Sequence, residues 1–271
     1  MSDRLGTQLL DRAVALLDVV ADGGSDGLSL KEIAERSGLN TATAHRILTS
    51  LVGHRLLSRP AGGRRYRLGT KLMVFGAKAA VGPGLRSQCQ PALQRLRRRT
   101  GEMVAVMARH NHDSVCIDRR DGDTVVQTLT GAIGGSVPLG VASGSMAMLA
   151  FMPEDEREFI LKANGQRYGA YSGLTVERVR ETIAEVRETG YALDPGEFLV
   201  GIAGIAVPIV AMETGPVASL GLTFLTAKLT PELVAAYAAL LREEVELIEP
   251  LLNPLDTRLR SPDRIMADGS R

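Results

Sequence analysis

The chain has 271 residues and a formal net charge of +1, and 45% of its residues are hydrophobic and 23% are charged. This balance is typical of a globular protein and argues against a disordered chain, while the length fits two domains better than one. No stretch approaches the roughly 18–20 uninterrupted apolar residues of a transmembrane helix, and the two cysteines, Cys89 and Cys116, have neither the number nor the spacing of a disulfide framework or a metal site.

A first helix is expected at about residues 7–22, where leucine, alanine and valine recur at helical spacing. The apolar run within it differs from a signal peptide, because aspartates interrupt it and neither a basic leader nor a cleavage site frames it. We therefore expect a cytoplasmic protein.

Two short helices are expected next, one at residues 30–37 and one from about residue 41 to residue 52 or 53. Ser29 and Glu32 have the spacing of a capping box at the start of the first helix, and Asn40 and Thr41 offer an N-cap to the second. Two helices joined by a short turn that contains glycine are typical of a helix-turn-helix.

A β-hairpin, or wing, is expected at residues 56–68, where two short extended segments flank a pair of glycines. Beyond the wing, helices are expected at residues 70–81 and 85–100, separated by a Gly-Pro-Gly break. We place the boundary between two domains in this region.

After Gly101, strands and helices fall into separate blocks, which is typical of an α+β fold. Strands are expected at residues 103–108, 114–118, 124–129, 204–210 and 217–224, and helices at 143–151, 154–162, 175–189 and 231–249. We predict a mainly antiparallel sheet with flanking helices. The polar tail after Asn253 lacks periodicity and is expected to be disordered.

The helix at residues 41–53 has a face that suits the major groove of DNA. Its apolar residues fall in one sector of a helical wheel and are expected to face the core. The opposite sector is small and polar with one long cation, Arg46, and a groove admits such a surface better than a bulky or acidic one. Polar groups at the helix start can also donate to phosphate oxygens. The candidate DNA-contacting residues here are Asn40, Thr41, Ala42, Thr43, His45, Arg46 and Thr49.

The charge distribution supports the same interpretation. Residues 40–69 contain six arginines and no acidic residue, and a local basic surface is typical of a protein that contacts the phosphate backbone. In the wing, Arg64, Arg65 and Arg67 are placed to contact the backbone or the minor groove. A small helical module that binds another protein is the alternative, because spacing alone often suggests a helix-turn-helix falsely.

A ligand pocket is expected in the second domain. The segment at 143–145 opens a helix, whose free N–H groups favour an anion such as a carboxylate. Between residues 194 and 204 we expect a loop running into a strand, where glycines let the backbone approach a ligand closely. The glycines can equally mark ordinary turns. The candidate residues are Ser143, Gly144, Ser145, Asp194, Glu197, Gly201, Gly204 and Thr223.

Catalysis and metal binding are the rival functions. A serine hydrolase would use Ser143 or Ser145, but there is no Gly-x-Ser-x-Gly elbow and no histidine follows His112. His110 and His112 could share one face of a strand, but no third metal ligand is evident, and a polar hairpin turn is the better interpretation. We expect no enzyme activity, no cofactor and no metal.

Dispersed motifs recur in a familiar order along residues 7–250. The segments at 27–39, 43–48 and 66–69 closely resemble the N-terminal domain of the IclR family of transcriptional regulators. The segments at 100–106, 138–144, 186–192 and 197–208 resemble the effector domain of the same family. The resemblance implies a cytoplasmic DNA-binding regulator, usually a dimer or tetramer, whose C-terminal domain binds a small molecule.

Individual residues match the family's functional positions. Arg46 resembles the arginine of its recognition helix, and the family's pocket supports Ser143, Gly144, Asp194, Gly204, Gly221 and Thr223 as lining positions. The chain departs from the family at Gly140, where many members have histidine, and at Met146, where they have lysine. The loss of two polar groups indicates a pocket that is more apolar or is entered differently, so the effector cannot be carried over from the family.

The predicted organisation is a winged helix-turn-helix DNA-binding domain at residues 1–69, a linker helix at 70–84, a GAF-like effector-binding domain at 85–252 and a disordered tail at 253–271. We expect a homodimer or homotetramer that sets two recognition helices in successive major grooves of a pseudo-palindromic operator in double-stranded DNA. A small carboxylic acid would shift the population of dimer geometries and change operator affinity. A repressor of a catabolic operon is expected, and activation stays open.

Overall fold

The structure is a computed structural model that describes residues 3–60, 63–79, 84–124, 132–211 and 215–252. These residues belong to two compact units, which divide between residues 82 and 83. None of the described helices is both long and apolar enough to cross a lipid bilayer.

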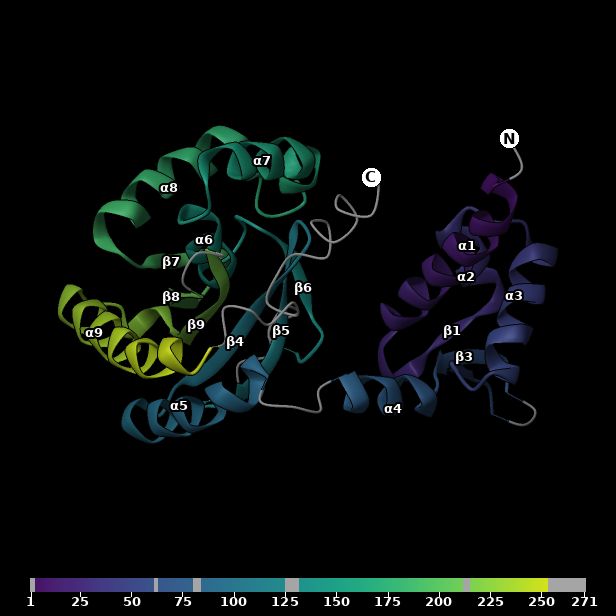
Figure 1. The fold of residues 1–271 in the computed structure, drawn as a ribbon, viewed down its shortest axis with the longest axis horizontal. Helices are drawn as coiled ribbons and strands as arrows, with labels where there is room; N and C mark the ends of the chain where they lie inside the picture. Colours follow the sequence, from purple (N-terminus) through teal and green to yellow (C-terminus); the bar gives the residue numbers. More distant parts are fainter. Residues whose placement is uncertain (1–2, 61–62, 80–83, 125–131, 212–214, 253–271) are drawn as a thin grey trace. The chain divides into compact units, whose positions relative to one another are not determined.

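The first unit is mainly helical (Figure 1). Its helices are α1 (Asp3–Ala21), α2 (Leu30–Ser37), α3 (Thr41–Gly53) and α4 (Thr70–Ala79). A small antiparallel sheet of order β1-β3-β2 contains β1 (Leu28–Ser29), β2 (Leu57–Ser58) and β3 (Arg65–Leu68). The pair α2–α3 followed by the β2–β3 hairpin is a winged helix-turn-helix.

Side-chain caps fix the ends of α2 and α3. The Ser29 hydroxyl accepts from the Glu32 N–H at 3.3 Å, and the Glu32 carboxylate accepts from the Ser29 N–H at 2.7 Å, which confirms the capping box. Gly38 ends α2 with a left-handed φ of 67°. The Asn40 side-chain oxygen accepts from the Thr43 N–H at 2.8 Å. These contacts span at most three residues, and both helices lie where they were predicted, with Asn40 as the cap of α3 and Gly53 as its last residue.

The core of the first unit lies where α1, α2 and α3 meet the small sheet. Its buried residues are aliphatic apart from one tyrosine: Leu16, Val20, Leu28, Ile33, Ile47, Leu48, Leu51, Leu57 and Tyr66. Because α3 contributes three of these residues from one face, its opposite face remains available to solvent.

The second unit contains a six-stranded sheet of order β6-β5-β4-β9-β8-β7, in which every pair of neighbours is antiparallel. The strands are β4 (Met103–His110), β5 (Asp113–Arg120), β6 (Ser136–Pro138), β7 (Ala192–Leu199), β8 (Ile202–Val210) and β9 (Pro216–Leu225). The predicted α+β class with a mainly antiparallel sheet is confirmed.

Helices cover both faces of this sheet (Figure 1). One face carries α5 (Leu85–Thr100) and α9 (Pro231–Ile248), and the other carries α6 (Ser143–Ala150), α7 (Glu154–Tyr168) and α8 (Val176–Thr189). Every residue of α6 from Ser145 to Ala150 is buried. This short apolar helix therefore lies between the sheet and α8, with its first turn over β8 and β9.

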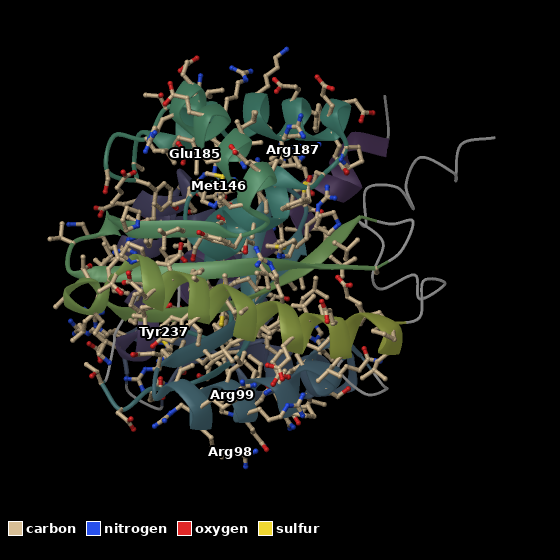
Figure 2. The ribbon with its side chains drawn as sticks, turned by 90° about the vertical axis from the view of Figure 1, so that its left-hand side faces the viewer. Arg98, Arg99, Met146, Glu185, Arg187 and Tyr237 are labelled. Carbon is tan, nitrogen blue, oxygen red and sulfur yellow. The ribbon has the colours of Figure 1, made fainter. Side chains whose placement is uncertain are left out.

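Ion pairs join α5 to α9 on the other face. Arg95 pairs with the Glu244 carboxylate at 2.6 Å, and Glu244 is only 1% exposed. Arg99 pairs with Glu243 at 2.8 Å. Arg98, between these two arginines, points to solvent (Figure 2) and makes no polar contact with the described residues.

Two strands were absent from the predicted elements, and one helix is longer. The two missed strands, β6 and β7, lie at the edges of the sheet, and β6 is short while β7 is irregular. Helix α7 continues six residues past its expected end at Lys162. The strand expected at 124–129 lies outside the described residues except for Thr124, which is in a bend, and so does the tail at 253–271.

The segment around Asp194 and Glu197 forms strand β7, so the loop expected there is wrong. Pro195 and Gly196, which suggested a loop, fall where the pairing of β7 with β8 is interrupted, between Asp194 and Leu199. Edge strands tolerate proline and glycine at such irregularities, because one side of the strand needs no hydrogen-bond partner.

The His110–Asp113 segment forms the turn between β4 and β5, as expected. Asn111 in this turn has a positive φ of 54°, and the His112 ring lies edge-on to Phe159 with centroids 5.4 Å apart. Within the described ranges, no group of three His, Cys, Asp or Glu side chains is arranged to hold a metal ion. The side chains of Cys89 and Cys116 are both buried, and burial raises the pKa of the Cys89 thiol to about 12.

Candidate functional site

The two faces of α3 differ as expected. Ala44, Ile47, Leu48 and Leu51 are buried. The residues exposed on the other face are Thr41, Ala42, His45, Arg46, Thr49 and Ser50, and Thr43 is half-buried. Arg46 makes no hydrogen bond or ion pair with the described residues, and the first turn of α3 carries no acidic side chain. The surface is therefore small, polar and cationic, and its one long side chain is free to reach a partner.

Two predicted residues of this surface have local structural roles. The Asn40 side chain caps α3, and the Thr49 hydroxyl donates to the His45 carbonyl at 2.8 Å. Both side chains remain exposed at the surface. Asn40 keeps its amide group, which is a donor, for other contacts while its oxygen serves the helix.

The three wing arginines are not equivalent. Arg64 and Arg67 are exposed and make no hydrogen bond or ion pair with the described residues. Arg65 donates to the Gly27 carbonyl at 2.7 Å and lies 3.6 Å from the Glu32 carboxylate. It therefore ties β3 to the start of α2, which the sequence could not indicate because the partners are more than thirty residues away.

A further arginine stiffens the wing. The Arg59 guanidinium lies 5.2 Å from the centroid of the Tyr66 ring, and its Nε donates to the Gly63 carbonyl at 2.8 Å. Gly27 has a positive φ of 68°, and a Cβ there would lie 2.4 Å from the Tyr66 carbonyl oxygen. The described part of the wing, which carries Arg64 and Arg67, is thus held by contacts on both sides.

In the second unit a small internal chamber of about 80 Å³ lies between the sheet and the start of α6. Its lining includes seven of the predicted pocket residues: Ser143, Gly144, Ser145, Asp194, Gly204, Gly221 and Thr223. Apolar side chains of β4 complete it, chiefly Met103 and Met107. Residues separated by eighty positions in the sequence therefore meet in one site.

Glycines allow α6 to approach the sheet closely at this chamber. A Cβ at Gly204 would lie 2.7 Å from the Ser143 hydroxyl oxygen, and one at Gly144 would lie 2.9 Å from the Met107 side chain. Both contacts are shorter than a Cβ normally makes, so a larger residue at either glycine would displace the Ser143 or Met107 side chain and reduce the space in the chamber.

The Ser143–Ser145 segment has mixed roles. The Ser145 hydroxyl accepts from the Val141 and Ala142 N–H groups at 3.0 and 3.1 Å and donates to the Ala142 carbonyl. It therefore braces the helix start and has no bonding capacity left for a ligand. The first N–H groups of α6 have no intrahelical acceptors and point towards the helix start, as at any α-helix N-terminus.

Asp194 is held by backbone donors at the edge of the chamber. Its Oδ1 accepts from the N–H groups of Gly196, Glu197 and Phe198 at 3.0, 2.8 and 3.3 Å. Burial raises the pKa of the Asp194 carboxyl, while the three N–H bonds act in the opposite direction. The net shift is upward, so this carboxyl takes up a proton more readily than an ordinary aspartic acid.

Two predicted residues lie outside the small chamber. Gly201 is exposed in the β7–β8 turn with a φ of 85° and nothing near it, so its glycine serves the turn. Glu197 lines a second and larger chamber of about 310 Å³, which meets the first at Ala142, Ser143, Asp194 and Phe198. Sequence reasoning missed this second chamber, because it forms only when α8 and β7 pack around the start of α6. No histidine lines either chamber.

Comparison with protein-family models matches nearly the whole chain. Residues 9–61 match the IclR helix-turn-helix domain, and residues 77–249 match the C-terminal domain of the bacterial transcriptional regulator IclR.

Individual relatives give the same result. The glycerol operon regulatory protein of Streptomyces coelicolor is 30% identical over 237 residues, which cover 84% of this chain and 91% of that protein. The transcriptional repressor IclR of Escherichia coli is 25% identical over 238 residues, or 86% of this chain and 85% of that protein.

Solved structures share the fold. An IclR transcriptional regulator from Alicyclobacillus acidocaldarius is 26% identical with a TM-score of 0.76, covering 90% of this chain and 98% of that one. An IclR homolog from Microbacterium hydrocarbonoxydans, solved in complex with 4-hydroxybenzoate, is 25% identical with a TM-score of 0.73 over the same shares.

Proposed function

The chain belongs to the IclR family of bacterial transcriptional regulators, and on that premise we propose that it represses a catabolic operon in the cytoplasm and is released from DNA by a small carboxylic acid. The observation that carries the DNA-binding part is the exposed face of α3, where Arg46 lies among small polar side chains and makes no hydrogen bond or ion pair with the described residues. Arg46 is suited to read a base edge, since arginine donates two parallel hydrogen bonds to guanine.

The chemistry of the small chamber supports a carboxylate ligand. The start of α6 presents backbone N–H groups and the positive end of the helix dipole beside Ser143 and Gly144. Met103, Met107 and Val137 supply an apolar wall. A similar protein was solved with 4-hydroxybenzoate, which is an aromatic carboxylic acid.

Apolar surface on the first unit supports self-association. Leu9, Leu10 and Val14 of α1 are exposed, and so are Met73 and Phe75 of α4. Contiguous exposed apolar side chains on helices are typical of contacts between subunits. We propose a homodimer or homotetramer that binds a pseudo-palindromic operator through two copies of α3.

The proposal is tested by mapping bound DNA across the genome and repeating the binding in vitro with and without benzoate and 4-hydroxybenzoate. We expect discrete sites with two half-sites about one helical turn or more apart, and release by an acid. A protein that ignores DNA at low ionic strength would contradict the regulator function, and release only by neutral or cationic compounds would contradict the carboxylate.

Replacing Arg64 with alanine is expected to weaken binding to operator and unrelated DNA alike. It should also reduce the slope of log affinity against log salt concentration by about one. The reason is that an exposed arginine on a wing contacts phosphates, which carry no sequence information. Fluorescence anisotropy at several salt concentrations measures both effects. Arg98→Ala, the same charge change on α5, should alter neither, and a loss confined to the operator sequence would refute the phosphate contact.

Affinity for benzoate is expected to rise as the pH falls towards the raised pKa of the Asp194 carboxyl. Burial already raises the pKa of Asp194, and a carboxylate bound beside it would raise that pKa further by like-charge repulsion. The complex then holds a proton that the free protein lacks, so lower pH favours the complex. Asp194→Asn keeps an oxygen for the three backbone donors and should abolish the pH dependence. Calorimetry over a pH series that gives the same wild-type affinity throughout would contradict a carboxylate bound beside Asp194.

A further inference from the structure

The larger chamber is bounded by the start of α6, the α7–α8 turn, α8 and strand β7. Figure 2 shows Met146 of α6 beneath α8, on which Glu185 lies, and both residues line the chamber. Its volume of about 310 Å³ reaches the range of about 300–1,000 Å³ found for small-molecule sites, whereas the small chamber falls well below it. The small chamber alone therefore accommodates a head group rather than a whole effector.

The two chambers adjoin each other and share part of their lining. Ala142, Ser143, Asp194 and Phe198 line both. Because Ser143 and Ala142 are also the start of α6, a carboxylate placed at that helix end has its substituent directed towards either chamber. Only the larger chamber has room for a ring or a chain of several carbons.

The walls of the larger chamber are mainly apolar. Met146, Leu174 and Leu193 line it. Tyr171 and Phe198 add two stacked rings with centroids 6.0 Å apart and an interplanar angle of 29°. Flat rings and a flexible thioether together favour a flat or aromatic body over a compact polar one.

One side of the larger chamber carries carboxylates that can accept hydrogen bonds from the polar end of a ligand. Arg178 is engaged by Glu181 and by Glu197, each at 3.4 Å. Glu185, one turn further along α8 than Glu181, makes no side-chain hydrogen bond or ion pair with the described residues. Its carboxylate is exposed at the chamber and available to accept from a ligand.

We propose that the effector is a bipartite acid: its carboxylate binds in the small chamber at the start of α6, its apolar body fills the larger chamber, and a hydrogen-bond donor at its far end binds Glu185. This inference rests on the proposed function, because it extends the same ligand beyond the carboxylate site. Glu185 is thereby a specificity-determining residue, which selects acids with a distal hydroxyl or amino group over acids without one.

Three probes separate the parts of the site: acetate, 3-phenylpropanoate and 3-(4-hydroxyphenyl)propanoate. The full-length protein is titrated by calorimetry, with acetate measured by competition against 3-phenylpropanoate. We expect the phenyl body to raise affinity at least tenfold over acetate, because it buries a ring among apolar walls. The hydroxyl should add about fivefold through a charge-assisted hydrogen bond that solvent weakens.

Variants test which part of the site produces each increase in affinity. Glu185→Ala should remove the advantage of the hydroxylated acid and leave 3-phenylpropanoate unchanged, while Glu188→Ala, the same change at an exposed position of α8 outside the chamber lining, should alter neither acid. Thr182→Trp fills the larger chamber and should reduce both long acids to the affinity of acetate. Retained acetate binding shows that this variant is folded.

The outcomes distinguish this inference from the proposed function. Equal affinities for acetate and the two longer acids, or a Glu185→Ala variant that keeps the preference for the hydroxylated acid, would overturn the bipartite site while leaving a carboxylate effector intact. Failure of all three acids to bind a protein that still binds its operator would overturn both the bipartite site and the carboxylate effector.

Discussion

Replacing Arg46 with alanine is expected to weaken operator binding by more than tenfold while thermal unfolding stays nearly unchanged. Arg46 is exposed on α3 and makes no internal hydrogen bond or ion pair among the described residues, so its removal disturbs no contact of the folded unit. A side chain that donates twice to a guanine is worth about 1–3 kcal/mol of discrimination against other bases. The variant should therefore lose affinity mainly for the operator, so that it binds the operator little better than unrelated DNA.

Gel shift or anisotropy with the mapped operator and with a scrambled sequence measures the effect. The Arg98→Ala variant removes an equally exposed arginine from the second unit and controls for net charge. An unchanged operator affinity would count against α3 as the recognition helix, and an equal loss on both sequences would show that Arg46 contacts phosphate rather than a base.

Replacing Gly204 with valine is expected to lower effector affinity at least tenfold while operator binding is kept, which gives a repressor that cannot be induced. A Cβ at Gly204 lies 2.7 Å from the Ser143 hydroxyl oxygen, and the two further methyl groups extend into a chamber of only about 80 Å³. Valine suits the extended backbone of β8, so the strand itself is not disfavoured. The carboxylate of the effector then no longer fits at the start of α6.

The control for this variant is Gly169→Val, at the end of α7. A Cβ there meets nothing within 4 Å, and its φ of −59° suits any residue. Both variants are compared by calorimetry with the effector and by operator binding with and without it. Normal release of Gly204→Val from DNA by the effector would show that the ligand binds elsewhere.

Local chemistry made the first unit predictable. The bounds of α2 and α3 follow from Ser29, Glu32, Gly38 and Asn40, each of which acts within three residues of the helix end it fixes. The buried and exposed faces of α3 follow from periodicity alone. Arg65 was expected at DNA together with Arg64 and Arg67, and its bond to the Gly27 carbonyl could not be anticipated because it depends on the pairing of β1 with β3.

The second unit was less predictable where structure depends on tertiary contacts. Strand β7 was missed because it contains Pro195 and Gly196, which are typical of loops. Strand β6 was missed because it is only three residues long. The resemblance to a family, together with glycines and a helix start, located most of the small chamber. The larger chamber arises from the packing of α8 and β7 around α6, and no motif marks it in the sequence.

The three backbone N–H groups that Asp194 binds lie where β7 loses its pairing with β8. One carboxylate thus replaces hydrogen bonds that a regular strand would obtain from its neighbour, and the same carboxylate borders both chambers. Asp194 thus both holds the edge strand β7 in place and lines the space where a ligand would bind. A ligand that competed for the Asp194 carboxylate would therefore also weaken the hydrogen bonds that hold this part of β7.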